Sequence, residues 1–216
     1  SMDAASQNPW TDRDVEAHWD RVASVYGVEN SKVKGAHDQR FVESIPHLAL
    51  FAGARVLNIT SRDGEADDYI RRAEPSARVV NAEISKGLMD LAGRRQLGLA
   101  QVKLDSYSRL PFKDAEIDRI LSLETLEHAA DPLAFLRELS RVAVPGARFV
   151  TAGEGVVKRD GLDPAASQGL RADSCRAGVA PGARRENHRP MAGYVRGRNG
   201  DTTVLCLRQA SIRSGT

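Results

Sequence analysis

Three carboxylates follow short apolar runs in the sequence, at Glu83, Asp105 and Glu124. A carboxylate at the end of one strand can accept hydrogen bonds from both hydroxyl groups of a ribose. An aspartate at the end of another strand can accept one from an adenine amino group. If these runs are neighbouring strands of one sheet, their ends meet at one edge, and the side chains there could hold a nucleoside.

The stretch RVLNITSRDGE, residues 55–65, could supply the rest of such a site. Its apolar residues run into a polar turn and then into a helical pattern, as a strand, a cofactor loop and a helix do in nucleotide-binding domains. The free N–H groups and the positive dipole end of a helix start suit a carboxylate or a phosphate. An ordinary strand-to-helix turn is the alternative.

This loop contains one glycine, Gly64, where dinucleotide-binding loops have several. A pyrophosphate lies almost against the backbone of such a loop, so the side chains of Thr60 and Arg62 would crowd it. S-adenosylmethionine joins an adenosine to an amino acid without a phosphate, and its positive sulfonium suits acidic surroundings such as Glu83 and Glu124. The loop therefore disfavours NAD more than it disfavours S-adenosylmethionine.

The elements that must position these residues alternate between strand-like and helix-like patterns. Two helices are predicted first, at 13–26 and about 36–50, on the spacing of their apolar residues. Strands are then predicted at 55–59, 77–82, 100–104, 117–123 and 147–151, and helices at 65–72, 85–95 and 131–142. Such alternation predicts a doubly wound, mostly parallel α/β sheet whose ligands bind beyond the carboxyl ends of the strands.

The composition changes after Thr151. Residues 151–216 contain 11 basic and 6 acidic residues and show little apolar periodicity before a last predicted strand at 202–207. A basic segment could bind an anion or a polynucleotide, and an irregular solvated segment is the alternative. The predicted organisation is a helical cap at 1–50, a nucleoside-binding core at 51–152 and an atypical segment at 153–216.

Composition excludes several classes of function. The net charge of +2 does not argue for a nucleic-acid partner. No apolar run approaches about 18 residues, so no membrane span is expected, and the first residues lack the pattern of a signal peptide. Cys175 and Cys206 lie far apart without metal-ligand spacing. Reduced thiols in a cytoplasmic protein without a metal site are expected, with a disulfide as the alternative.

Residues from about 14 to 151 resemble the class I S-adenosylmethionine-dependent methyltransferases, in the branch that includes ubiquinone/menaquinone-biosynthesis C-methyltransferases. The most specific stretch is LPFKDAEIDRILSLETLEHAADPLAFLRELSRVAVPGARFV, residues 110–150. It is similar to the family pattern L-P-F-x-D-x-x-F-D, then L-E-H, D-P and L-x-E-x-x-R-V-x-x-P-G-G. The first motif, V-L-D-x-G-x-G-x-G, stands here as VLNITSRDG, residues 56–64.

The sequence departs from the family at four positions. Asn58 replaces the usual aspartate, Thr60 and Arg62 replace two glycines, and Ala147 replaces the second glycine of the P-G-G turn. These departures bear on affinity for the cofactor rather than on the fold.

The resemblance implies a Rossmann-like fold of the class I methyltransferase type. It implies S-adenosylmethionine as methyl donor, S-adenosylhomocysteine as product and a small molecule as acceptor. The loop residues would line the site through backbone atoms, and Tyr26 belongs to a helix that closes over the cofactor in relatives. The expected cofactor-binding residues are Tyr26, Asn58, Thr60, Ser61, Arg62, Gly64, Glu83, Ile84, Asp105, Ser106 and Glu124.

His128 is the candidate general base, because its unperturbed pKa lies near neutrality. A structural role in the L-E-H feature, such as a helix cap, is the alternative. Three functions compete for the whole chain: a small-molecule methyltransferase, a non-catalytic protein that keeps the fold to bind S-adenosylmethionine or a protein partner, and an NAD(P)-dependent oxidoreductase, which the loop disfavours. A homodimer is left open.

Overall fold

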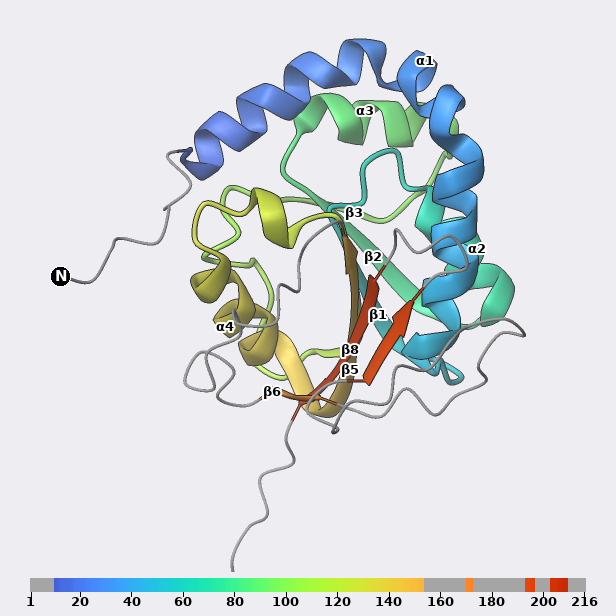
Figure 1. Cartoon of the computed structure of the whole chain (residues 1–216), viewed down its shortest axis with the longest axis vertical. Coiled ribbons are helices and arrows are strands. Elements are labelled where there is room, and N and C mark those ends of the chain that lie inside the picture. The colour runs from blue at the N-terminus through green and yellow to red at the C-terminus, as the bar shows by residue number, and fades with distance from the viewer. Residues whose placement is uncertain (1–9, 154–169, 173–192, 197–202, 210–216) are drawn as a thin grey trace, which may run out of the picture.

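The computed structural model describes residues 10–153, 170–172, 193–196 and 203–209. Five parallel strands form the centre of its sheet: β1 (Arg55–Ile59), β2 (Arg78–Glu83), β3 (Gln101–Lys103), β4 (Ile117–Leu123) and β5 (Ala143–Gly153). The strands β6 (Leu170–Ala172), β7 (Gly193–Arg196) and β8 (Thr203–Gln209) follow. The strand order is β3-β2-β1-β4-β5-β8-β6, with β7 also paired to β8 (Figure 1). The predicted Rossmann-like, mostly parallel α/β fold is confirmed.

The carboxyl ends of the central strands lie level with one another. In the parallel register, Ile59 of β1 is the partner of Ala82 in β2 and of Ser122 in β4. The strand order reverses between β1 and β4, and ligands of open α/β sheets bind at such a reversal. The residues that follow these strand ends therefore meet at one edge of the sheet.

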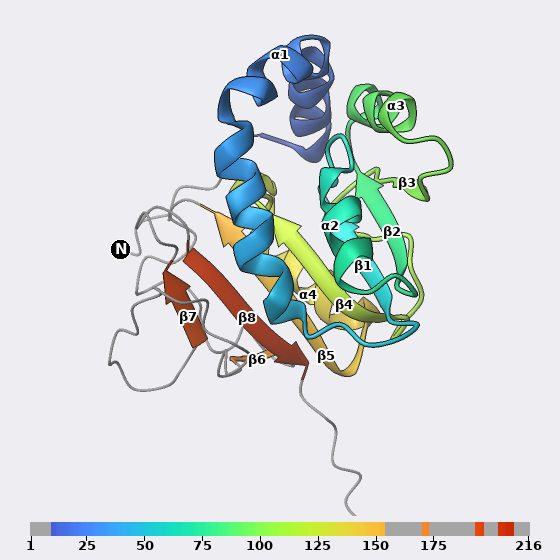
Figure 2. The ribbon, with the colours of Figure 1, turned by 90° about the vertical axis from the view of Figure 1, so that its right-hand side faces the viewer.

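Helices cover both faces of the sheet (Figure 2). On one face, α2 (Glu65–Ala73) and the 3-10 helix η1 (Ile45–Leu48) bury Ile70 and Leu48 against Val56 and Leu121. On the other face, α4 (Pro132–Val142) packs against the sheet through the buried side chains Phe135, Leu136, Leu139 and Val142. The helix α3 (Lys86–Arg95) follows β2 in the chain and packs against the first helix.

That first helix, α1 (Asp12–Ser44), is one continuous element of 33 residues. The prediction of two helices, at 13–26 and about 36–50, was wrong. The connecting residues contain no proline, and Lys32–Glu29 and Lys34–Asp38 ion pairs of 2.8 Å stabilise the helix there. Thr11 caps it in a capping box with Asp14.

The last predicted strand, at 202–207, is present as β8 at 203–209. It runs antiparallel to β5, with Leu207 opposite Phe149, and β6 and β7 pair with its other edge. Neither β6 nor β7 was predicted. Cys175 and most of the basic segment lie outside the described residues, so the disulfide and anion-binding alternatives stay predictions, as does the division into three domains.

Replacing Phe135 by alanine is expected to lower the free energy of unfolding by about 3–5 kcal/mol. The ring is fully buried and packs against Tyr107, so its removal would leave a cavity. Leu133→Ala on the same helix is the matched control, since that side chain is 41% exposed. Urea unfolding followed by circular dichroism measures both. Equal losses in the two variants would contradict the assigned core face of α4.

Candidate functional site

The loop from Thr60 to Gly64 connects β1 to α2 at the carboxyl edge. Thr60, Arg62 and Gly64 have φ values of +59°, +51° and +79°, all in the left-handed region. These are the three positions at which the family motif has glycine. The backbone thus keeps the conformation of a glycine loop, although two positions carry side chains at a strain of about 1 kcal/mol each.

Glu83 connects this loop to the end of β2. Its buried carboxylate accepts hydrogen bonds from the backbone N–H groups of Arg62 (2.7 Å), Ile84 (2.8 Å) and Ser85 (3.0 Å). Burial raises the pKa of Glu83, and the three N–H groups oppose that shift. The predicted residues Arg62, Glu83 and Ile84 therefore meet, with Ile84 contributing its backbone while its side chain is buried.

Glu124 at the end of β4 lies between two arginines. Its Oε2 accepts from Nη2 of Arg62 at 2.5 Å, and its Oε1 forms an ion pair with Nη1 of Arg40 on α1. Burial alone would raise the pKa of Glu124, but the two guanidinium groups lower that pKa below its ordinary value. One carboxylate thus serves as counter-charge to two guanidinium groups.

The first half of α1 lies over the ends of β2 and β3. Asp12 accepts from Ser106 Oγ (2.5 Å) and from the backbone N–H of Tyr107 (3.0 Å). Asp20 accepts from Ser85 Oγ (2.6 Å) and from the N–H of Gly87 (3.0 Å) at the start of α3. The predicted residue Asp105 has a fully exposed side chain, and its Oδ1 lies 3.9 Å from Lys103 Nζ.

Asn58, where the family has aspartate, belongs to a buried polar chain. Its Nδ2 donates to Asn81 Oδ1 at 2.8 Å, and Asn81 Nδ2 donates to Asp67 Oδ1 at 2.9 Å. An ionised aspartate at position 58 could not donate to Asn81. The departure at Asn58 is thus matched by its neighbours.

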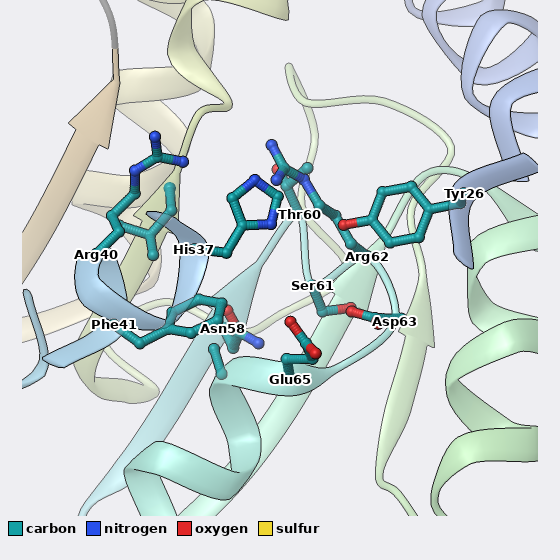
Figure 3. A pocket seen from close by; sticks show the side chains of 12 residues that line it. Tyr26, His37, Arg40, Phe41, Asn58, Thr60, Ser61, Arg62, Asp63 and Glu65 are labelled. Carbon is teal, nitrogen blue, oxygen red and sulfur yellow. The ribbon is translucent and has the colours of Figure 1, made fainter. Parts of the chain in front are cut away.

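A small pocket lies between the second half of α1 and the loop (Figure 3). It is lined by five predicted residues: Tyr26, Asn58, Thr60, Ser61 and Arg62. Sequence reasoning missed His37, Arg40 and Phe41 on α1, which complete the wall. The only available signal was their helical spacing from Tyr26, since residues 11 apart lie near one face of a helix.

Electrostatics in this pocket follow from burial. Burial raises the pKa of Tyr26 to about 12, and burial beside Glu65 raises the pKa of Asp63 to about 6. Ser61 Oγ, Arg40 Nε and Arg62 Nε are buried without a hydrogen-bond partner among the described residues. The pocket therefore presents unused donors.

His128 lies on the other side of Trp19, outside this pocket. It ends the 3-10 helix η2 (Leu126–His128), and its ring contacts the Trp19 ring edge-on at 5.7 Å between centroids. Burial lowers the pKa of His128, and the nearby Arg62 lowers it further. The side chain of Asp131 accepts from Ala134 N–H at 2.9 Å. The cap of α4 is thus Asp131, and the roles of His128 as a general base or as a structural residue both stay predictions.

The part of the chain that the structure describes contains neither a metal-binding cluster nor a membrane-spanning helix. No group of His, Cys, Asp or Glu side chains there is arranged to hold a metal ion. None of the helices described is both long and apolar enough to cross a membrane. The contacts described above thus define the candidate site as the carboxyl edge of β1, β2 and β4 together with the helix α1, which covers that edge.

Residues 57–151 match a family model described as a methyltransferase domain. The core of the chain is therefore similar to a methyltransferase domain over a little less than half of the chain. A demethylmenaquinone methyltransferase of Clavibacter sepedonicus is 31% identical over 139 residues, which are 63% of this chain and 56% of that protein. A ubiquinone/menaquinone biosynthesis C-methyltransferase of Desulfotalea psychrophila is 27% identical over 138 residues, with the same shares. The chain spans little more than half the length of these relatives.

Solved structures share the fold of this core. A TehB-like S-adenosylmethionine-dependent methyltransferase of Corynebacterium glutamicum superposes with a TM-score of 0.61 at 17% identity, covering 88% of this chain and 98% of the other. A second, from Aquifex aeolicus, gives a TM-score of 0.55 at 21% identity, covering 83% and 98%. The class I methyltransferase fold expected from the sequence is therefore confirmed.

Replacing Glu124 by glutamine is expected to destabilise the domain by about 2 kcal/mol at pH 7, because two largely buried guanidinium groups lose their counter-charge. The pKa of Glu124 is lowered on folding, so its stabilising effect is present above 4.5, the ordinary value, and is lost as the pH falls through the folded pKa. The difference in the free energy of unfolding between wild type and Glu124→Gln should therefore shrink as the pH falls below 4.5.

Chemical denaturation from pH 7 to pH 3 measures the gap. Asp114→Asn is the matched control, because Asp114 pairs with Arg141 while 82% exposed and should change stability by less than about 0.5 kcal/mol. A gap for Glu124→Gln that is constant with pH would contradict the assigned ion pairs.

Proposed function

We propose that the chain binds S-adenosylmethionine at the carboxyl edge of the sheet, transfers its methyl group to a small-molecule acceptor and releases S-adenosylhomocysteine. The observation that carries the proposal is the loop backbone, which keeps the three left-handed positions of a glycine loop beside the Glu83 carboxylate. The family match over residues 57–151 supports the same function.

The chemistry of the donor set fits an adenosine. Three N–H groups use three of the roughly four acceptor positions of the Glu83 carboxylate. The remaining position could accept from a ribose hydroxyl once the groups that cover this fully buried side chain move aside. The exposed carboxylate of Asp105 lies 3.9 Å from Lys103 Nζ through one oxygen, and its remaining acceptor positions could accept from an adenine amino group. Glu83, Asp105 and Ser106 would thus hold the nucleoside, with the loop backbone of Thr60, Ser61 and Gly64 beside it.

The bound cofactor would supply a methyl group on a positively charged sulfur, for in-line attack by the acceptor. The residues of this chain bind, orient and exclude water. Trp19 and Tyr26 on α1 cover the edge. His128 is neutral at pH 7, because burial lowers its pKa, so it can accept a proton from an acceptor that must lose one.

The names of the relatives favour an acceptor of the quinone type, an aromatic small molecule. The net charge of +2 gives a nucleic acid no support as partner. We place the protein in the cytoplasm on its two widely spaced cysteines and leave a homodimer as part of the proposal.

One observation favours a second candidate, a non-catalytic protein that keeps the methyltransferase fold. The carboxylate of Glu124, expected near the amino group of the cofactor, already binds Arg40 and Arg62. A domain that had ceased to bind the cofactor would tolerate such an arrangement.

Replacing Asp105 by alanine is expected to weaken binding of S-adenosylhomocysteine about tenfold, through loss of one hydrogen bond to the adenine. Its side chain is fully exposed, so the fold should not change. Asp90→Ala, which removes another exposed carboxylate, should leave the affinity unchanged. Isothermal titration calorimetry measures both, with NAD as the ligand control. Tighter binding of NAD than of either S-adenosyl ligand would reject the proposed function.

A further inference from the structure

The side chain of Arg62 extends across the cleft between the two carboxylates of the site. Its backbone N–H donates to Glu83 at 2.7 Å, and its Nη2 donates to Glu124 at 2.5 Å. If Glu83 holds a ribose and Glu124 an amino group, the ligand must extend from one carboxylate to the other. Arg62 extends between the same two groups, and its side chain is only 15% exposed.

The surroundings of the Arg62 guanidinium are those that suit an organic cation. The guanidinium carbon lies 5.8 Å from the centroid of the Trp19 ring, and aromatic rings attract cations through their faces. Figure 3 shows the Tyr26 hydroxyl directed toward the Arg62 side chain. A positive sulfonium or ammonium entering this space would find its favourable partners already bound to a cation of the protein itself.

The loop backbone does not require this side chain. Arg62 has a φ of +51°, a conformation that glycine adopts without strain. The arginine is therefore an addition to a loop whose backbone a glycine would satisfy.

We propose that Arg62 is the residue that determines which S-adenosyl ligands the cleft accepts, by acting as a resident cation at its amino-acid end. The inference rests on the proposed function. A ligand with a charged amino-acid end must displace Arg62 from Glu124. A neutral nucleoside thioether without that end, such as 5′-methylthioadenosine, needs only the adenosine half of the cleft.

Calorimetric titration with S-adenosylmethionine, S-adenosylhomocysteine and 5′-methylthioadenosine tests this proposal. Wild type should bind 5′-methylthioadenosine about tenfold more tightly than S-adenosylmethionine. Arg62→Gly empties the space and should strengthen binding of both amino-acid-bearing ligands about tenfold or more, with little change for 5′-methylthioadenosine. Arg62→Gln keeps most of the side-chain volume but removes the charge. It should therefore strengthen binding of S-adenosylmethionine, the sulfonium ligand, more than binding of 5′-methylthioadenosine, the neutral thioether.

Arg55→Gln is the matched control. It removes an ion-paired guanidinium at the start of β1, the end of that strand opposite the loop, so it should leave binding of all three ligands unchanged. Thermal melting of each variant checks that it is folded.

No gain in either Arg62 variant would overturn the inference. If wild type then bound S-adenosylmethionine at micromolar concentration, the proposed function would stand without it. A gain in the Arg62 variants with no binding by wild type would support the inference while counting against methyl transfer by the native chain.

Discussion

The hydrogen bonds of Glu83 hold the carboxyl edge together. A buried carboxylate is costly unless donors surround it, and three backbone N–H groups from two segments do so here. The bond from Arg62 fixes the β1–α2 loop against the end of β2, and with it the left-handed positions at Thr60 and Arg62. Those positions direct the Thr60 hydroxyl to Thr125, at 2.5 Å, and the Arg62 guanidinium to Glu124. The link between β1 and β4 at this edge thus depends on one carboxylate of β2.

Sequence reasoning located the strands because buried parallel strands form short apolar runs with polar ends. It placed Glu83 and Glu124 at the edge for the same reason. It failed for α1, because residues 27–35, which connect its two halves, lack the apolar spacing by which a helix is recognised. The Lys32–Glu29 and Lys34–Asp38 ion pairs stabilise the helix there instead. Strands β6 and β7, of three and four residues, are too short for alternation to be read.

The site was predicted in outline but not in its chemistry. The loop residues were expected to act through backbone atoms, yet the Arg62 side chain is the group that connects Glu124 to the loop. Arg40 was missed because it lies on a helix 84 residues before its partner Glu124. The sequence thus predicted which carboxylates stand at the strand ends. It did not predict which arginine side chains would neutralise their charge.

The length of α1 has a mechanical consequence. At 33 residues it is about 50 Å long, and its two halves pack on different parts of the domain, the first on α3 and the second near η1 and α2. Between residues 27 and 36 only Asn30 is buried. A molecule that binds beneath the first half of α1 has to displace that half. Either the whole helix rotates as a rigid body, which disturbs the packing of the second half, or one turn unwinds in the middle segment, where few side chains are buried. The second route leaves the packing of the second half of α1 in place, so α1 would open by unwinding between Gly27 and Gly35.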